Sequence, residues 1–95
     1  MGSQIHKNAR DVAQGDWILT DRGFGGYRQE PHLVEGVSFE NDRMGRLRAI
    51  LRLFHPWSQR HSRKSFGPYS TVRMVPRPTD PDAVYWMGLY EAGQC

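Results

Sequence analysis

One stretch of nine residues decides the fold of this chain: Arg46-Leu47-Arg48-Ala49-Ile50-Leu51-Arg52-Leu53-Phe54. Two structural periods fit it. In a strand, side chains alternate between two faces, so the odd-numbered apolar residues from Leu47 to Leu53 would face a core and the arginines would face outward, with Ile50 as the exception. In a helix, an apolar stripe would form from Leu47, Ile50, Leu51 and Phe54. Turn residues precede the stretch, at 40–45, and they favour the strand as the second half of a hairpin.

Further strands are predicted on both sides of this stretch. Residues 33–39 alternate, with Leu33, Val37 and Phe39 on one face and Glu35 as the exception. A Gly15-Asp16 turn leads into an apolar run over 17–20, and residues 70–75 alternate again before a proline. Three glycines between 21 and 27 predict a loop. These elements are typical of a small sheet connected by short turns.

The C-terminal segment fits either a helix or a strand. Thr79 is a candidate N-cap ahead of Asp80-Pro81-Asp82, and Gly93 would end the helix. The alternative is an aromatic-rich strand over 83–90, and both alternatives remain open from the sequence.

The predicted fold class is therefore mainly β, or α+β if the last segment is helical. We expect a small twisted sheet curled into an SH3-like or OB-like partial barrel. With 95 residues the chain is expected to form one domain over 1–95. Its flexible parts are predicted at 1–8 and 93–95, with a long mobile basic loop over 55–69.

Composition narrows the functional classes. The chain is 38% hydrophobic, which is typical of a globular protein, and its apolar runs are too short to cross a membrane. The N-terminus lacks a signal peptide and the single cysteine, Cys95, is the last residue, so we expect a cytoplasmic protein. His55 and His61 have no companion pair of metal ligands, and no Gly-x-Ser-x-Gly motif is present. We therefore expect no cofactor, no metal and no enzymatic activity.

Charge is distributed unevenly along the chain. The net charge is only +3, yet residues 43–79 contain eight arginines and Lys64 with no Asp or Glu. A compact domain with such a segment presents a positive surface to phosphates or to an acidic partner.

The candidate binding residues lie within this segment. On a strand, Arg46, Arg48 and Arg52 share one face, and each guanidinium can bind a phosphate. The predicted loop adds cations next to an aromatic side chain on which a base can stack, namely Arg60, Arg63 and Lys64 with Trp57. The sequence thus predicts a non-catalytic module that binds a polyanion, with nucleic acid as the favoured ligand. It does not discriminate between DNA and RNA.

An alternative uses the same arginines against protein. A phage or bacterial type of interaction or inhibitor module would bind an acidic surface of a larger protein, with exposed rings as anchors: Trp57, Tyr85, Trp86 and Tyr90. The plainest interpretation is an ordinary solvated surface. A homodimer formed through an edge strand is compatible with either function.

Overall fold

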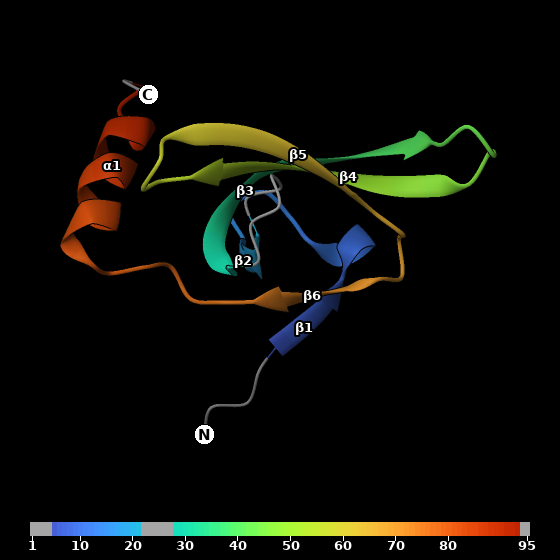
Figure 1. Cartoon of the computed structure of the whole chain (residues 1–95), viewed down its shortest axis with the longest axis horizontal. Helices are drawn as coiled ribbons and strands as arrows, with labels where there is room; N and C mark the ends of the chain where they lie inside the picture. The colour runs from blue at the N-terminus through green and yellow to red at the C-terminus, as the bar shows by residue number, and fades with distance from the viewer. Residues whose placement is uncertain (1–4, 22–27, 94–95) are drawn as a thin grey trace.

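The computed structural model describes residues 5–21 and 28–93 and contains a single sheet with a helix at one end (Figure 1). Its elements are β1 (Ile5–Asn8), the 3-10 turn η1 (Ala9–Asp11), β2 (Trp17–Thr20), β3 (Glu30–Asn41), β4 (Leu47–His55), β5 (Arg60–Phe66), β6 (Thr71–Met74) and α1 (Pro81–Glu91). The strands are antiparallel and lie in the order β1-β6-β2-β3-β4-β5. The mainly β prediction is confirmed, and the C-terminal segment is a helix.

The decisive stretch is a strand, as predicted. β4 pairs with β3 on one side and β5 on the other, which makes it an interior strand of the sheet. Ala49, Leu51 and Leu53 are fully buried, and the last two join Ile18, Val34 and Val72 in the main core. Ile50 faces the other way and is still mostly buried.

A β-bulge divides β3, which the sequence did not predict. The register with β4 shifts between Val34 and Gly36, so Glu35 is the extra residue. On one side of the bulge Leu33 packs with Trp17, whereas beyond it Val37 packs against the main core. Leu33 and Val37 therefore belong to different clusters, although their spacing predicted one common face.

The prediction of a long mobile basic loop over 55–69 is wrong, because most of this segment forms a strand. A turn follows β4, and residues 60–66 form β5, which pairs with β4 from His55↔Arg60 to Ala49↔Phe66. The sequence of this segment lacks the apolar alternation that predicts a strand. β5 is an edge strand, and its backbone pairing with β4 holds it in place. Its cations are typical of an edge strand that avoids unwanted pairing with other chains.

The N-terminal segment also differs from expectation. Residues 5–8, placed in a flexible end by the sequence, form β1 and pair with β6. Three parts of the predicted flexible ends and glycine loop lie outside the described residues: 1–4, 22–27 and 94–95.

Helix α1 packs on the outer face of the sheet at one end. Its N-cap is Asp80, whose side chain accepts a hydrogen bond from the Ala83 backbone N–H, and not Thr79 as expected. Gly93 follows the helix with a φ of 77°, which favours glycine and fits the predicted end. Met87 is buried in a second cluster with Trp17, Leu33 and Phe54. The helix therefore extends the core beyond the sheet.

The sheet is curled but not closed. Only residues 67–70 connect β5 to β6, so the sheet must curve to bring these strands near each other (Figure 1). β1 and β5 remain the two edges. These features confirm a partial barrel. In the part of the chain that the structure describes, no helix has the length and hydropathy needed to span a membrane.

Candidate nucleic-acid interface

The outer face of β4 and β5 carries exposed arginines opposite each other. Leu51 and Leu53 point into the core, so Arg52 between them points outward. Its partner across the strand pair is Arg63 of β5. Paired residues of antiparallel strands project on the same side, and like charges placed directly opposite are destabilising. The register thus places two cationic side chains on the same side of neighbouring strands, which costs some stability.

Arg52 lies over a glycine. Its partner on the other side is Gly36 of β3, and a Cβ atom at residue 36 would overlap the Arg52 guanidinium. Gly36 is therefore buried beneath this side chain, which crosses its bare backbone. Arg52 itself is exposed, and no carboxylate among the described residues pairs with it. A glycine inside a strand often marks such a close approach.

Two further arginine contacts complete this surface. Arg63 forms an ion pair with Glu40 at 3.1 Å, but both side chains are more than half exposed, at 62% and 55%. Such exposed pairs contribute little stability and are readily exchanged for another anion. Arg48 donates to the Ser65 hydroxyl at 2.9 Å and to the Ser65 carbonyl oxygen at 3.3 Å. These hydrogen bonds orient the Arg48 side chain, which also has Glu40 opposite it on β3 and interacts electrostatically with Asp42.

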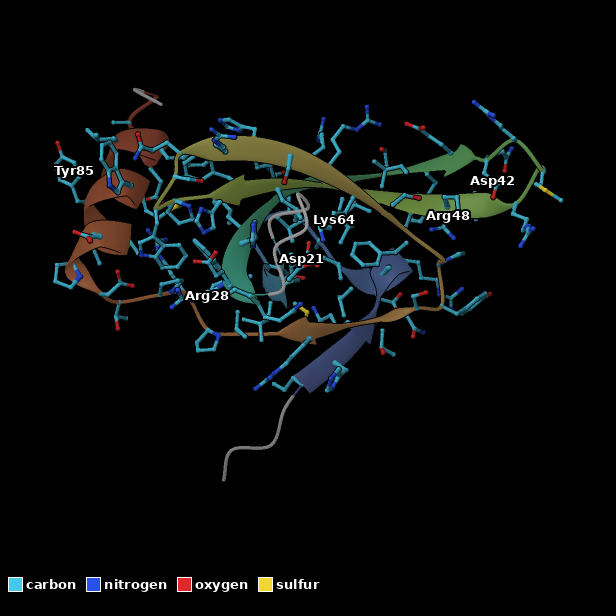
Figure 2. The ribbon with its side chains drawn as sticks, in the orientation of Figure 1. Asp21, Arg28, Asp42, Arg48, Lys64 and Tyr85 are labelled. Atoms are coloured by element: carbon cyan, nitrogen blue, oxygen red, sulfur yellow. The ribbon has the colours of Figure 1, made fainter. Side chains whose placement is uncertain are left out.

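We call Arg48, Arg52 and Arg63 on the outer side of β4 and β5 the arginine face. Ile50 and Ser65 are paired residues between its members. Arg48 and Arg52 are four residues apart on one strand, which corresponds to about 13 Å. Figure 2 shows Arg48 where the β3–β4 hairpin leaves the rest of the sheet.

The other predicted cations lie elsewhere. Lys64 projects on the opposite side of β5, where its Nζ lies 2.7 Å from Asp21 Oδ1 and its side chain is only 21% exposed (Figure 2). This pair joins β5 to the end of β2. Arg46 belongs to the turn before β4, and Arg60 begins β5 opposite His55. The structure therefore brings together three of the six predicted cations.

The predicted stacking residue has a contact within the fold. The indole N–H of Trp57 donates to Asp80 Oδ2 at 2.9 Å, and its ring lies against His55 with centroids 5.1 Å apart. The Trp57 bond is the main reason that the pKa of Asp80 is lowered. Trp57 thereby connects the turn after β4 to the start of α1.

A serine, a histidine and a carboxylate lie together under this turn, the residue types of a hydrolase catalytic triad. The Nδ1 atom of His55 lies 2.6 Å from the Ser58 hydroxyl oxygen, and the Nε2 atom lies 3.4 Å from Glu30 Oε1. The Ser58 backbone N–H also points at Nδ1, at 3.2 Å. His55 is 2% exposed. We interpret this group as a structural network, because the imidazole is buried and Ser58 uses both its polar groups to close the turn.

A second network fixes α1 to the bulge. Glu35 accepts from the Tyr90 hydroxyl at 2.6 Å and contacts His61 Nδ1 at 2.9 Å. The Tyr90 ring stacks on Phe54, with centroids 4.4 Å apart. Burial and the Glu35 carboxylate raise the pKa of Tyr90 to about 12, so the phenol remains protonated and able to donate. The bulge at Glu35 thus places a carboxylate against the helix.

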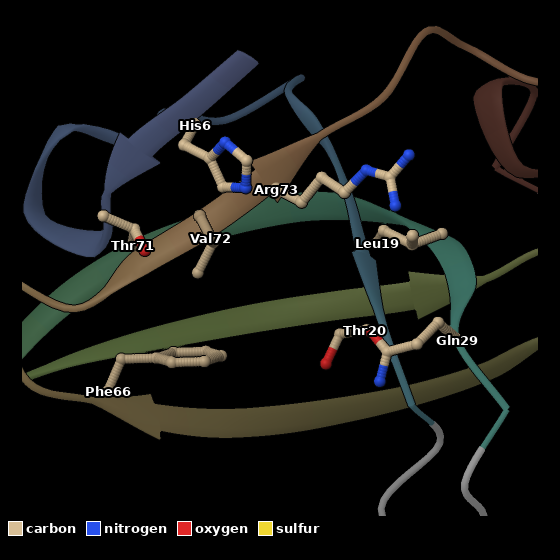
Figure 3. A pocket seen from close by; sticks show the side chains of 8 residues that line it. All are labelled: His6, Leu19, Thr20, Gln29, Phe66, Thr71, Val72 and Arg73. Carbon is tan, nitrogen blue, oxygen red and sulfur yellow. The ribbon is translucent and has the colours of Figure 1, made fainter. Parts of the chain in front are cut away.

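A cavity of about 300 Å³ opens between β5 and β6 (Figure 3). Phe66 approaches it from β5, and Val72 and Leu19 add apolar surface from β6 and β2. His6 and Arg73 are its ionisable lining residues. No group of three or more potential metal ligands exists within 5–21 and 28–93.

The sequence interpretation missed the neighbours that shape the arginine face. The alternating pattern predicts Gly36 as an ordinary strand position, whereas a lone glycine between bulky residues also indicates a close approach of another group. Ser65 and Glu40 carried no signal, because their roles depend on strand register. The chain matches no protein-family model and no curated protein sequence. Its function is therefore inferred from the side chains themselves.

Proposed function

We propose that this protein is a non-catalytic module that binds nucleic acid through the arginine face. The observation that supports this proposal best is the direct opposition of Arg52 and Arg63. A sheet loses stability by holding like charges together, and a phosphate bound between them would remove that cost. Arg48 extends the same surface along β4, as a backbone with repeated phosphates requires.

Phosphate binding has a characteristic salt dependence. Each neutralised phosphate releases condensed counterions, so the slope of log affinity against log salt measures the number of contacts. For three arginines we expect a slope of about 2 to 3, and removal of one contact lowers it by roughly 0.7 to 0.9.

The test compares two variants that remove the same charge. Arg52→Gln should weaken binding to DNA oligonucleotides and flatten the salt dependence, whereas Arg73→Gln, which neutralises an exposed arginine of β6, should change both much less. Binding is measured by fluorescence anisotropy between about 50 and 200 mM salt. Negligible binding at the lowest salt, or equal losses in the two variants, would contradict the proposal.

A second candidate function is binding to an acidic protein surface. Tyr85 and Val84 are 61% and 56% exposed on α1, and the Tyr85 ring packs edge-on against Trp86. Figure 2 shows Tyr85 at the end of the molecule opposite to Arg48. Trp57 and Tyr90, by contrast, have contacts within the fold. Under this alternative Tyr85→Ala abolishes partner binding at constant salt and leaves DNA binding unchanged.

A further inference from the structure

The distal part of the β3–β4 hairpin extends beyond the partial barrel. Every residue from 38 to 47 is exposed, and Figure 1 shows this segment projecting away from α1. We call residues 38–47 the arm. Large apolar side chains are exposed along it: Met44 at 74%, and Phe39 and Leu47 at 50% each. These side chains contribute nothing to either core cluster.

The tip of the arm has a defined shape. Asp42 Oδ1 accepts from the backbone N–H groups of Met44 at 2.8 Å and Arg46 at 2.9 Å. The Asp42 backbone N–H donates to the Arg46 carbonyl oxygen, and Gly45 adopts a φ of 76° to close the turn. The Arg46 N–H is the main cause of a lowered pKa at Asp42. Asp42 therefore pairs the Met44 and Arg46 amides and fixes the turn that presents Met44.

The tip carries charges of both signs, because the Asp42 carboxylate lies close to Arg46 and next to Arg43 in the chain. Asp42 accepts hydrogen bonds from the turn amides and keeps a negative charge that acts on Arg46 and Arg48, whereas Glu40 pairs with Arg63. Among the described residues neither Arg43 nor Arg46 forms an ion pair, although the charge of Asp42 acts on Arg46. The tip thus combines an exposed thioether with the guanidinium groups of Arg43 and Arg46, and the arginine face lies at its base.

The dimensions of the arm fit one groove of duplex DNA. Beyond Ala49, where the pairing of β4 with β5 ends, two residue pairs remain, Glu40↔Arg48 and Asn41↔Leu47, and the turn follows them. At roughly 3.4 Å per residue this two-stranded part is about 7 Å long before the turn, which is close to the groove depth of about 8 Å. A two-stranded ribbon with its side chains is about 10 Å across, which fits a major groove about 12 Å wide and not a minor groove about 6 Å wide.

We propose that the arm enters the major groove of duplex DNA, with Met44 against the base edges and Arg43 and Arg46 on the flanking phosphates. This inference rests on the proposed function and specifies its ligand. Apolar side chains in the major groove contact the C5-methyl group of thymine. The major groove of duplex RNA is too narrow for side chains to read, so the arm also selects DNA over RNA.

The first test uses three ligands of equal length and matched sequence: duplex DNA, duplex RNA and single-stranded DNA. The protein should bind duplex DNA at least tenfold more tightly than duplex RNA. Met44→Ala and Arg43→Gln should each weaken duplex DNA binding about tenfold and leave single-strand binding unchanged. Ile5→Ala, which removes an exposed apolar side chain from β1, is the matched control and should have no effect.

The second test identifies the groove. Replacing thymine by uracil removes the C5-methyl group and should weaken binding several-fold for the native protein but not for Met44→Ala. A duplex with bulky C5 substituents in the major groove should bind poorly, whereas a minor-groove ligand such as netropsin should not compete.

The outcomes separate this inference from the proposed function. Equal binding to all three ligands, loss of binding with Arg52→Gln and no effect of arm variants would overturn the groove assignment and leave the arginine face intact. Competition by netropsin would overturn it as well. Failure to bind any nucleic acid would overturn both proposals.

Discussion

The two ends of β4 show how one strand serves two purposes. At its C-terminal end, Phe54 and His55 are almost fully buried, and the neighbouring polar groups have partners in β3, the following turn or α1. Toward its N-terminal end, the outward-facing Arg52 lies over Gly36, and Arg48 hydrogen-bonds to Ser65. The first end holds the helix on the sheet, and the second end leaves positive charge available.

This difference separates stability from binding along the chain. Substitutions at the buried end should lower the free energy of unfolding and alter binding only through folding. Substitutions on the arginine face should weaken binding and leave the protein folded, without lowering the free energy of unfolding. The following predictions test that separation.

The largest effect is expected at Phe54. The side chain is fully buried, stacks on Tyr90 and contacts the cluster that contains Met87. Phe54→Ala should lower the free energy of unfolding by about 3 to 5 kcal/mol, because it removes buried area and leaves a cavity. Phe54→Leu, with a loss of about 1 to 2 kcal/mol, allows the measurement if the alanine variant does not fold. Urea unfolding measures both, and a loss below 1 kcal/mol for alanine would contradict the role of this cluster.

The next effect concerns the attachment of α1. Asp80→Ala removes the acceptor shared by the Ala83 N–H and the Trp57 indole, so the melting temperature should fall by about 5 °C. Thr79→Ala is the matched control, since Thr79 was the N-cap expected from the sequence and the structure gives that position to Asp80. Thermal unfolding should show little change in the control. A larger loss at Thr79 would contradict the observed cap.

The buried His32 gives the same end of the molecule a pH dependence. Burial lowers the pKa of His32 below its unfolded value near 6.5, so the unfolded chain binds a proton that the folded protein resists. Stability should therefore fall as the pH decreases below about 6.5, with a slope of at most about 1.4 kcal/mol per pH unit. His32→Gln should reduce this slope between pH 5 and 6.5, whereas His6→Gln, at an exposed position, should leave it unchanged. A slope that is unaffected by His32→Gln would assign the dependence to other groups.

The smallest effect is expected on the arginine face itself. Arg52→Gln relieves the opposition to Arg63, so the free energy of unfolding should rise by about 0.2 to 1 kcal/mol at low salt. The gain should vanish at high salt, where exposed charges are screened. Urea unfolding at two salt concentrations makes the comparison. Destabilisation by Arg52→Gln would show that this arginine supports the fold and would remove the contrast between the two ends.

Local patterns were sufficient where apolar residues alternate or turn chemistry is clear. The strand at 47–55, the strand at 17–20 and the end of the helix at Gly93 agree with such patterns. β5 was missed because its residues 60–66 alternate no apolar side chains and acquire strand geometry from pairing with β4. β1 was missed for the same reason.

The predicted site was only partly assembled by the fold. Arg48, Arg52 and Arg63 share a face because β4 and β5 pair in one particular register. Lys64 follows Arg63 directly and projects to the opposite side, where Asp21 binds it. The position of a residue in the cationic segment does not predict which side of the sheet it faces, since adjacent residues of a strand face opposite ways.

The amino-acid order by itself determined the excess of arginine, the period-two burial of Leu51 and Leu53, and the turns that divide the chain into short strands. These properties depend on neighbours in the chain. The tertiary structure alone decided that Arg52 meets Arg63, that it lies over Gly36, and that Glu35 bulges toward Tyr90. Those contacts join residues that are distant in sequence, and strand register, which no local pattern specifies for a polar edge strand, determines which of them meet.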